Sequence, residues 1–189
     1  MSIQPKSDEV FQASGGIVQV HAADVAKVLA KGTTNSRKRA RLCAHPGPED
    51  RLHEMLIVLD RGTYIRPHRH GNKAESFHII EGELDVVIFH DDGSIRDVIR
   101  MGPYASGKAF YYRIMEPCYH SVLINTPFAL FHETTNGPFN RGDTEFAPWS
   151  PAEGDPGVES FVSRLRLCTV PLAGRASDGV NRGMDRRVA

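Results

Sequence analysis

The chain has 189 residues, of which 40% are hydrophobic and 24% charged, a composition typical of one soluble globular domain. Lysine plus arginine equals aspartate plus glutamate, at 23 each, so no basic excess favours nucleic acid as a partner. No run approaches the ~18 consecutive apolar residues of a membrane span, and the three cysteines follow no metal-finger spacing. We therefore expect a cytoplasmic protein with reduced thiols that binds neither nucleic acid nor membrane.

The N-terminal region predicts a leader, a strand and a helix. Residues 1–16 end in Ser-Gly-Gly and predict a flexible leader. IVQV at 17–20 alternates like a strand, and the apolar spacing of HAADVAKVLAKG at 21–32 predicts a helix that Gly32 ends.

A basic cluster opens the next segment, 36–50, with Arg37, Lys38, Arg39 and Arg41. It is either a solvated face beside a strand or a clamp for phosphate or carboxylate at the mouth of a barrel. In the second interpretation, Arg37 and Arg41 bind the substrate.

From Leu52 the pattern is persistently that of short strands with Gly, Asn and Asp turns between them. Asp92-Gly93 after VVIFH predicts a hairpin. About eight strands without helices between them indicate a sandwich or a barrel. The predicted strands are 53–60, 62–70, 76–82, 84–93, 95–102, 109–114, 121–125 and 128–134.

The C-terminal region predicts an arm, a helix and a tail. Segment 136–157 is rich in Gly and Pro and carries the only tryptophan, Trp149, so we expect it to pack over the barrel. Residues 158–167 predict an amphipathic helix, and 171–189 lack periodicity and predict a disordered tail. Residues 17–170 then form a single domain.

A metal site is predicted from the spacing of histidines. His68 and His70 are two apart, so in a strand both imidazoles point to the same face. Glu75 can reach the same point if the chain turns back, and His120 is a further ligand. Such a donor set leaves coordination positions open and suits iron, manganese, nickel or zinc.

The same stretch resembles a known motif. From Gly62 to Gly82, the spacing G-x5-H-x-H-x4-E-x6-G matches the first cupin motif at every anchor. The second cupin motif, Pro-x-Gly-x-x-His followed by Asn, is partly met by MEPCYHSVLIN at 115–125, with His120 in place and Asn125 one residue late.

A closer likeness, over roughly residues 18 to 167, is to the WbuC family of cupin-fold metalloproteins. It implies an all-β fold, a cupin-type jelly-roll β-barrel with a short N-terminal helix and a C-terminal helix packed outside. The resemblance also implies that the substrate is a sugar or a sugar nucleotide of surface-polysaccharide metabolism. The likeness rests on YIRPHRH, KAESFHIIEGELDVVIF, FYYRI, HETTNGPF and FAPWSPAEGD.

Strand parity proposes substrate-binding residues beside the metal. Tyr64 and Arg66 share the parity of His68, so both are expected to face the interior. Lys73, next to the metal loop, is expected either to hold an anionic substrate or to be solvated.

Three further side chains are candidates for proton transfer. His132 and Glu133 are adjacent in a strand, so one of them must point inward, where it acts as a general acid or base or makes a structural hydrogen bond to the arm. Tyr112 is expected to face inward from a neighbouring strand.

Three functions remain open at this point. The first is a metal-dependent enzyme, such as an isomerase or epimerase, acting on a small polar molecule. The second is an iron(II) dioxygenase, and the third is a non-catalytic module that binds a metal or ligand. By analogy with cupins, the strand predicted at 17–20 is a candidate for pairing two copies into a homodimer.

Overall fold

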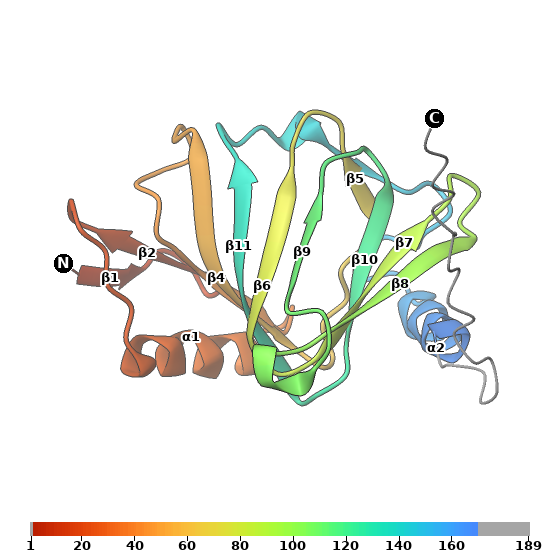
Figure 1. Cartoon of the computed structure of the whole chain (residues 1–189), viewed down its shortest axis with the longest axis horizontal. Coiled ribbons are helices and arrows are strands. Elements are labelled where there is room, and N and C mark those ends of the chain that lie inside the picture. The colour runs from red at the N-terminus through yellow and green to blue at the C-terminus, as the bar shows by residue number, and fades with distance from the viewer. Residues whose placement is uncertain (1, 170–189) are drawn as a thin grey trace, which may run out of the picture.

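The computed structural model describes residues 2–169, which form two β-sheets and two α-helices (Figure 1). Neither described helix is long and apolar enough to cross a membrane. The tail predicted at 171–189 lies outside the described residues. The elements are β1 (Ser2–Pro5), β2 (Val10–Ser14), α1 (Ala22–Thr34), β3 (Arg39–Cys43), β4 (Leu52–Asp60), β5 (His68–His70), β6 (Glu75–Glu81), β7 (Leu84–Phe89), β8 (Ile95–Met101), η1 (Tyr104–Ser106), β9 (Tyr111–Ile114), β10 (Tyr119–Ile124), β11 (Phe128–Asn136), η2 (Arg141–Asp143), β12 (Thr144–Phe146) and α2 (Val158–Thr169).

The strand order is that of a jelly roll. The larger sheet runs β1-β2-β3-β4-β11-β6-β9, and the smaller runs β12-β5-β10-β7-β8. From β4 to β11 the chain repeatedly crosses between the sheets, so that β4-β11-β6-β9 and β5-β10-β7-β8 form the two four-stranded halves. The predicted all-β, cupin-type jelly-roll barrel is therefore confirmed.

The two helices cover the outer faces of the sheets. On α1, Val28 packs against Leu42 and Val58 of the larger sheet, and on α2, Leu165 packs in one cluster with Val87 of the smaller sheet. Strand β7 is buried at all six positions, because one face meets the interior and the other meets the cluster under α2. Each large apolar side chain buried in this way contributes ~1.5–3 kcal/mol.

The N-terminal residues differ from the expectation. Residues 2–14, predicted as part of a flexible leader over 1–16, form β1 and β2, and β2 pairs in parallel with β3. Phe11 on β2 is buried in the same cluster as α1, which gives the segment an apolar anchor. Residues 17–20, predicted as a strand, have no regular secondary structure, so the strand lies earlier in the chain.

The helix also passes the glycine that was expected to end it. Gly32 is buried inside α1, which continues to Thr34. A Cβ at position 32 would lie 3.2 Å from both the Ala40 nitrogen and Val58 Cγ1. This glycine therefore allows the helix to approach the sheet closely, rather than terminating it.

Replacing Gly82 with alanine should destabilise the fold. Gly82 has φ +78°, and a Cβ there would overlap the Phe128 carbonyl oxygen and lie 2.8 Å from Thr126 Oγ1. We expect a loss of at least ~2 kcal/mol from backbone strain and this overlap, seen as a lower midpoint in urea denaturation. Gly71→Ala in the same motif is the control, since nothing lies within 4 Å of its added Cβ; equal midpoints for the two variants would refute this explanation.

Candidate functional site

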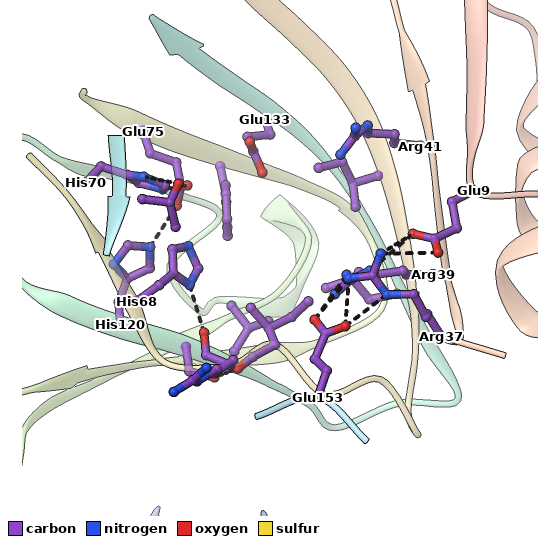
Figure 2. Close-up of a pocket in the computed structure, with 18 of the residues that line it drawn as sticks. Glu9, Arg37, Arg39, Arg41, His68, His70, Glu75, His120, Glu133 and Glu153 are labelled. Atoms are coloured by element: carbon purple, nitrogen blue, oxygen red, sulfur yellow. Dashed lines mark hydrogen bonds and ion pairs between the residues drawn. The ribbon is translucent and has the colours of Figure 1, made fainter. Parts of the chain in front are cut away.

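The four side chains singled out as metal ligands converge between the two sheets (Figure 2). His68 and His70 come from β5, Glu75 from the start of β6, and His120 from β10, where it lies directly opposite His68. One donor atom from each residue lies within 4.8 Å of the others. These residues could therefore hold one metal ion.

The imidazoles are oriented by backbone carbonyls. His68 Nδ1 lies 2.9 Å from the Arg66 carbonyl oxygen, and His120 Nδ1 lies 3.0 Å from that of Cys118. Because a carbonyl oxygen only accepts, both Nδ1 atoms donate, which leaves the Nε2 lone pairs free for a cation. His120 Nε2 is buried and has no hydrogen-bond partner within residues 2–169. Such an orphaned lone pair is what a bound metal would satisfy, so the residues fit the ion.

Glu75 is buried and held by Tyr112. The Tyr112 hydroxyl donates to Glu75 Oε1 over 2.9 Å, and the Nε2 atoms of His70 and His120 each lie 3.5 Å from a Glu75 oxygen. Burial alone would raise the pKa of Glu75, but the neighbouring histidines outweigh it and hold that pKa well below its usual range. Glu75 is therefore a carboxylate at neutral pH, and Tyr112 orients it.

Burial also controls the charge of His68 and of Tyr112. Burial, with His120 nearby, lowers the pKa of His68 to about 4, so His68 is neutral at physiological pH, as a metal ligand must be. Burial and the Glu75 carboxylate raise the pKa of Tyr112 well above its usual range, so its hydroxyl remains a donor.

The cluster opens into a cavity of about 660 Å³ inside the barrel, a size usual for small-molecule sites. Glu133 of β11 lines this cavity, between the histidines and Arg41 in Figure 2. Burial and the nearby Glu75 raise the pKa of Glu133 well above its usual range, against the opposing effect of Arg41. Glu133 is thus a carboxyl group that can carry a proton near the cluster.

His132 does not reach the cavity. Its Nε2 lies 3.9 Å from Glu54 Oε1, and the side chain is about one-third exposed. Successive residues of β11 point to opposite faces, so the inward position of Glu133 puts His132 outside. Of the adjacent pair that the sequence proposed for proton transfer, Glu133 is therefore the member at the site.

The predicted arginine cluster lies across the cavity from the histidines (Figure 2). Arg37 and Arg39 are paired with two carboxylates: Arg37 Nη1 lies 3.0 Å from Glu9 Oε2, and Arg37 Nε lies 2.9 Å from Glu153 Oε2. Arg39 Nη2 lies 3.1 Å from Glu153 Oε1. Arg41 also lines the cavity but forms no ion pair within residues 2–169.

Of the other substrate-binding candidates, only Arg66 lines the cavity. The Tyr64 hydroxyl instead donates to the Pro151 carbonyl oxygen at 2.9 Å, and Lys73 Nζ pairs with Asp143 at 3.3 Å. The predicted strand 62–70 is regular only at His68–His70, so the strand parity that was extended back to Tyr64 does not apply.

Sequence reasoning missed the cavity residues that come from distant segments. Glu9 lies between β1 and β2, and Phe146 lies on β12 of the arm, opposite His68 of β5. Arg141 and Glu153 also belong to the arm. The Gly- and Pro-rich composition indicated an arm over the barrel, but no local pattern indicated which of its side chains would enter the cavity.

Tyr112→Phe should weaken metal binding without abolishing it. The hydroxyl fixes one oxygen of Glu75, and loss of such an outer contact costs ~10-fold or more in metal affinity. Titration against a chelator of known affinity measures the change. Tyr111→Phe, on the exposed side of the same strand, should leave the affinity unchanged; equal effects of both substitutions would contradict the role of Tyr112.

Comparisons with known proteins give distant similarities. Residues 20–101 match a family described as a domain of unknown function, DUF6016. No curated protein matches the chain in sequence.

Among solved structures, protein SO0799 from Shewanella oneidensis is 17% identical, with a TM-score of 0.45 over 55% of this chain and 66% of that one. The Cnp3 cupin domain from Schizosaccharomyces pombe is 13% identical, with a TM-score of 0.41 over 53% and 66%. The capsular polysaccharide assembling protein CapF from Staphylococcus aureus is 18% identical, with a TM-score of 0.43 over 52% and 27%. Each match thus spans less than two thirds of the similar structure.

Proposed function

We propose that this chain is a metal-dependent enzyme that acts on a small organic molecule inside the barrel. The observation that carries the proposal is one cavity that contains both the cluster of His68, His70, Glu75 and His120 and the proton-carrying Glu133. A bound divalent metal would supply a Lewis acid that polarises a substrate oxygen. Iron, manganese, nickel and zinc all accept this donor set.

Glu133 would move the proton in the reaction. A carboxyl group with a raised pKa can give a proton to a substrate near neutral pH and take one back, which suits an isomerase or an epimerase. Tyr112 would act only through Glu75, as a positioning residue. Phe77 and Phe131 line the cavity and would keep bulk water from the reacting atoms.

The resemblance to the WbuC family supports a sugar or a sugar nucleotide of surface-polysaccharide metabolism as the starting point for a substrate search. The resemblance is one of sequence motifs, and a motif shared across a fold does not by itself define a reaction. Substrate panels should therefore include sugars and other small oxygen-rich molecules.

The proposal is tested by metal analysis followed by turnover assays. Protein purified without chelators should contain close to one equivalent of a divalent transition metal by elemental analysis. Turnover of a panel compound under anaerobic conditions, lost on chelation, supports the proposed enzyme. Oxygen consumption with an iron-loaded sample identifies a dioxygenase instead, and a stoichiometric metal without turnover of any compound favours a non-catalytic binding module.

A further inference from the structure

The cavity carries an excess of positive charge. Five arginines and four glutamates line it. Two of these arginines and two of these glutamates pair with one another, and a third glutamate, Glu75, belongs to the histidine cluster. A bound metal would add further positive charge. The arginines of this lining that form no ion pair within residues 2–169 are Arg41, Arg66 and Arg141.

The guanidinium of Arg66 is fixed by neutral hydrogen-bond acceptors. Its Nε donates to Ser150 Oγ at 3.1 Å, and its Nη2 donates to the carbonyl oxygens of Ala147 and Ser150 at 3.3 and 3.2 Å. The guanidinium also lies 5.0 Å from the ring centre of Phe146. All its acceptors are neutral, and Nη1 has no hydrogen-bond partner among the described residues. A half-buried guanidinium fixed in this way has no counter-ion, and an anionic ligand would provide one.

Arg41 differs from its neighbours in the basic cluster. The guanidinium groups of Arg37 and Arg39 pair with the carboxylates of Glu9 and Glu153, whereas Arg41 lines the cavity and forms no ion pair in the described chain. These ion pairs show that carboxylate groups fit against arginine side chains at this end of the cavity. Of Arg37, Arg39 and Arg41, Arg41 is therefore the one whose guanidinium can pair with an anionic ligand.

Apart from Glu133, the wall between the histidine cluster and the arginine cluster is mostly apolar. Ile57 and Leu59 of β4, Val122 of β10 and Phe131 of β11 line the cavity, together with Ile65. These side chains offer no hydrogen bonds, so hydroxyl groups placed against them would lose their hydration without compensation. A body made of hydrocarbon or an aromatic ring would instead gain from burial against the same wall.

We infer that the ligand of this cavity is an organic oxyanion with an apolar body, whose carboxylate or phosphate group binds Arg41. The inference rests on the proposed function only for the identity of the cavity, since the arginines bind the anion whether or not a metal is present. It narrows the substrate from sugars in general to molecules with an anionic end and an extended apolar surface.

Calorimetric titration with four probes tests the inference: 3-phenylpropanoate, 3-phenylpropanamide, phenyl phosphate and glucose 6-phosphate. We expect at least one of the two aromatic anions to bind at least 10-fold more tightly than both the neutral amide and glucose 6-phosphate. The aromatic anion that binds more tightly shows whether the cavity prefers a carboxylate or a phosphate. The inference would be overturned if neither aromatic anion binds, if neither binds more tightly than the amide, or if glucose 6-phosphate binds more tightly than both.

Matched arginine variants locate the anion. Arg41→Met should weaken binding of the aromatic anion at least 10-fold, and Arg113→Met, which changes the net charge equally at an exposed position of β9 outside the cavity lining, should change it less than 3-fold. Equal effects would overturn the assignment to Arg41. Arg66 is left in place because its hydrogen bonds also fasten the arm.

Repeating the titration after metal removal separates this inference from the proposed function. If the arginines bind the anion, its binding should survive removal of the metal by a chelator. If the probe binds the metal through its carboxylate, chelation should abolish binding, and that result would overturn the inference. Elemental analysis of Arg41→Met should show an unchanged metal content. Failure of the proposed function would appear instead as a protein that contains no metal but still binds the aromatic anion.

Discussion

Replacing His120 with alanine should remove tight metal binding, lowering the affinity by more than ~100-fold, because loss of an outer contact alone costs up to that factor. His120 is buried, its Nδ1 donates to the Cys118 carbonyl, and its Nε2 has no hydrogen-bond partner in residues 2–169, so it is available to the proposed ion. Elemental analysis after dialysis, and titration against a chelator, measure the change.

His132→Ala is the matched control for that experiment. It also removes one histidine from a barrel strand, but on the outer face, where the imidazole lies 3.9 Å from Glu54. We expect unchanged metal content. A circular dichroism spectrum like that of the unmodified protein shows that His120→Ala has kept its fold. Retention of the metal by a folded His120→Ala protein, or its loss from His132→Ala, would remove the basis for this metal site.

Replacing Glu133 with glutamine should lower kcat by about 10²- to 10⁴-fold, the usual contribution of a general acid or base, while the metal content stays the same. The substitution keeps the size of the side chain and removes its proton. The measurement is kcat on the substrate that the panel identifies, with metal content determined on the same sample. Glu54→Gln, on the outer side of neighbouring β4, is the control and should leave kcat unchanged. A rate equal to that of the unmodified enzyme would exclude Glu133 from proton transfer.

The raised pKa of Glu133 gives the same variant a readout that needs no substrate. The metal-free folded protein holds this proton more tightly than the unfolded chain, so Glu133 reduces stability as the pH rises above the usual glutamate pKa toward the raised one. Glutamine does not titrate and removes this loss. The melting temperature of metal-free Glu133→Gln should therefore exceed that of the unmodified protein at pH 8, and the difference should shrink at pH 5. A difference that does not vary with pH would contradict the raised pKa.

Three of the four metal ligands could be predicted because they lie close together in the sequence, and His120 was indicated by the partly met second cupin motif. His68 and His70 are two residues apart in a strand, which alone puts both imidazoles on one face, and Glu75 begins the next strand. A sandwich or a barrel could be predicted for a similar reason, since the turns and the alternating pattern repeat along the chain, and the resemblance to the cupin motifs then selected the jelly roll. Tyr64 could not be placed, because strand parity holds only where the strand is regular, and β5 begins at His68.

The ion-pair partners of the arginine cluster could not be predicted from the sequence either. Arg37 was expected either to be solvated or to clamp a substrate, and the structure pairs it with Glu9 and Glu153. These two glutamates are far from Arg37 in the chain and from each other, and neither lies in a pattern that indicates a partner. Ion pairs between such distant residues depend on the path of the N-terminal hairpin and the arm, which loop composition does not specify.

Strand β5 is only three residues long, and its neighbours in the sheet are β10 and β12, both synthesised much later. A newly made chain that ends before Phe146 therefore lacks the pairing that holds His68 and His70 in register. Loading of the proposed metal would consequently be a late event that follows closure of the barrel. The dimensions of the finished protein would then select the ion, and not the order in which cations meet the histidines during translation.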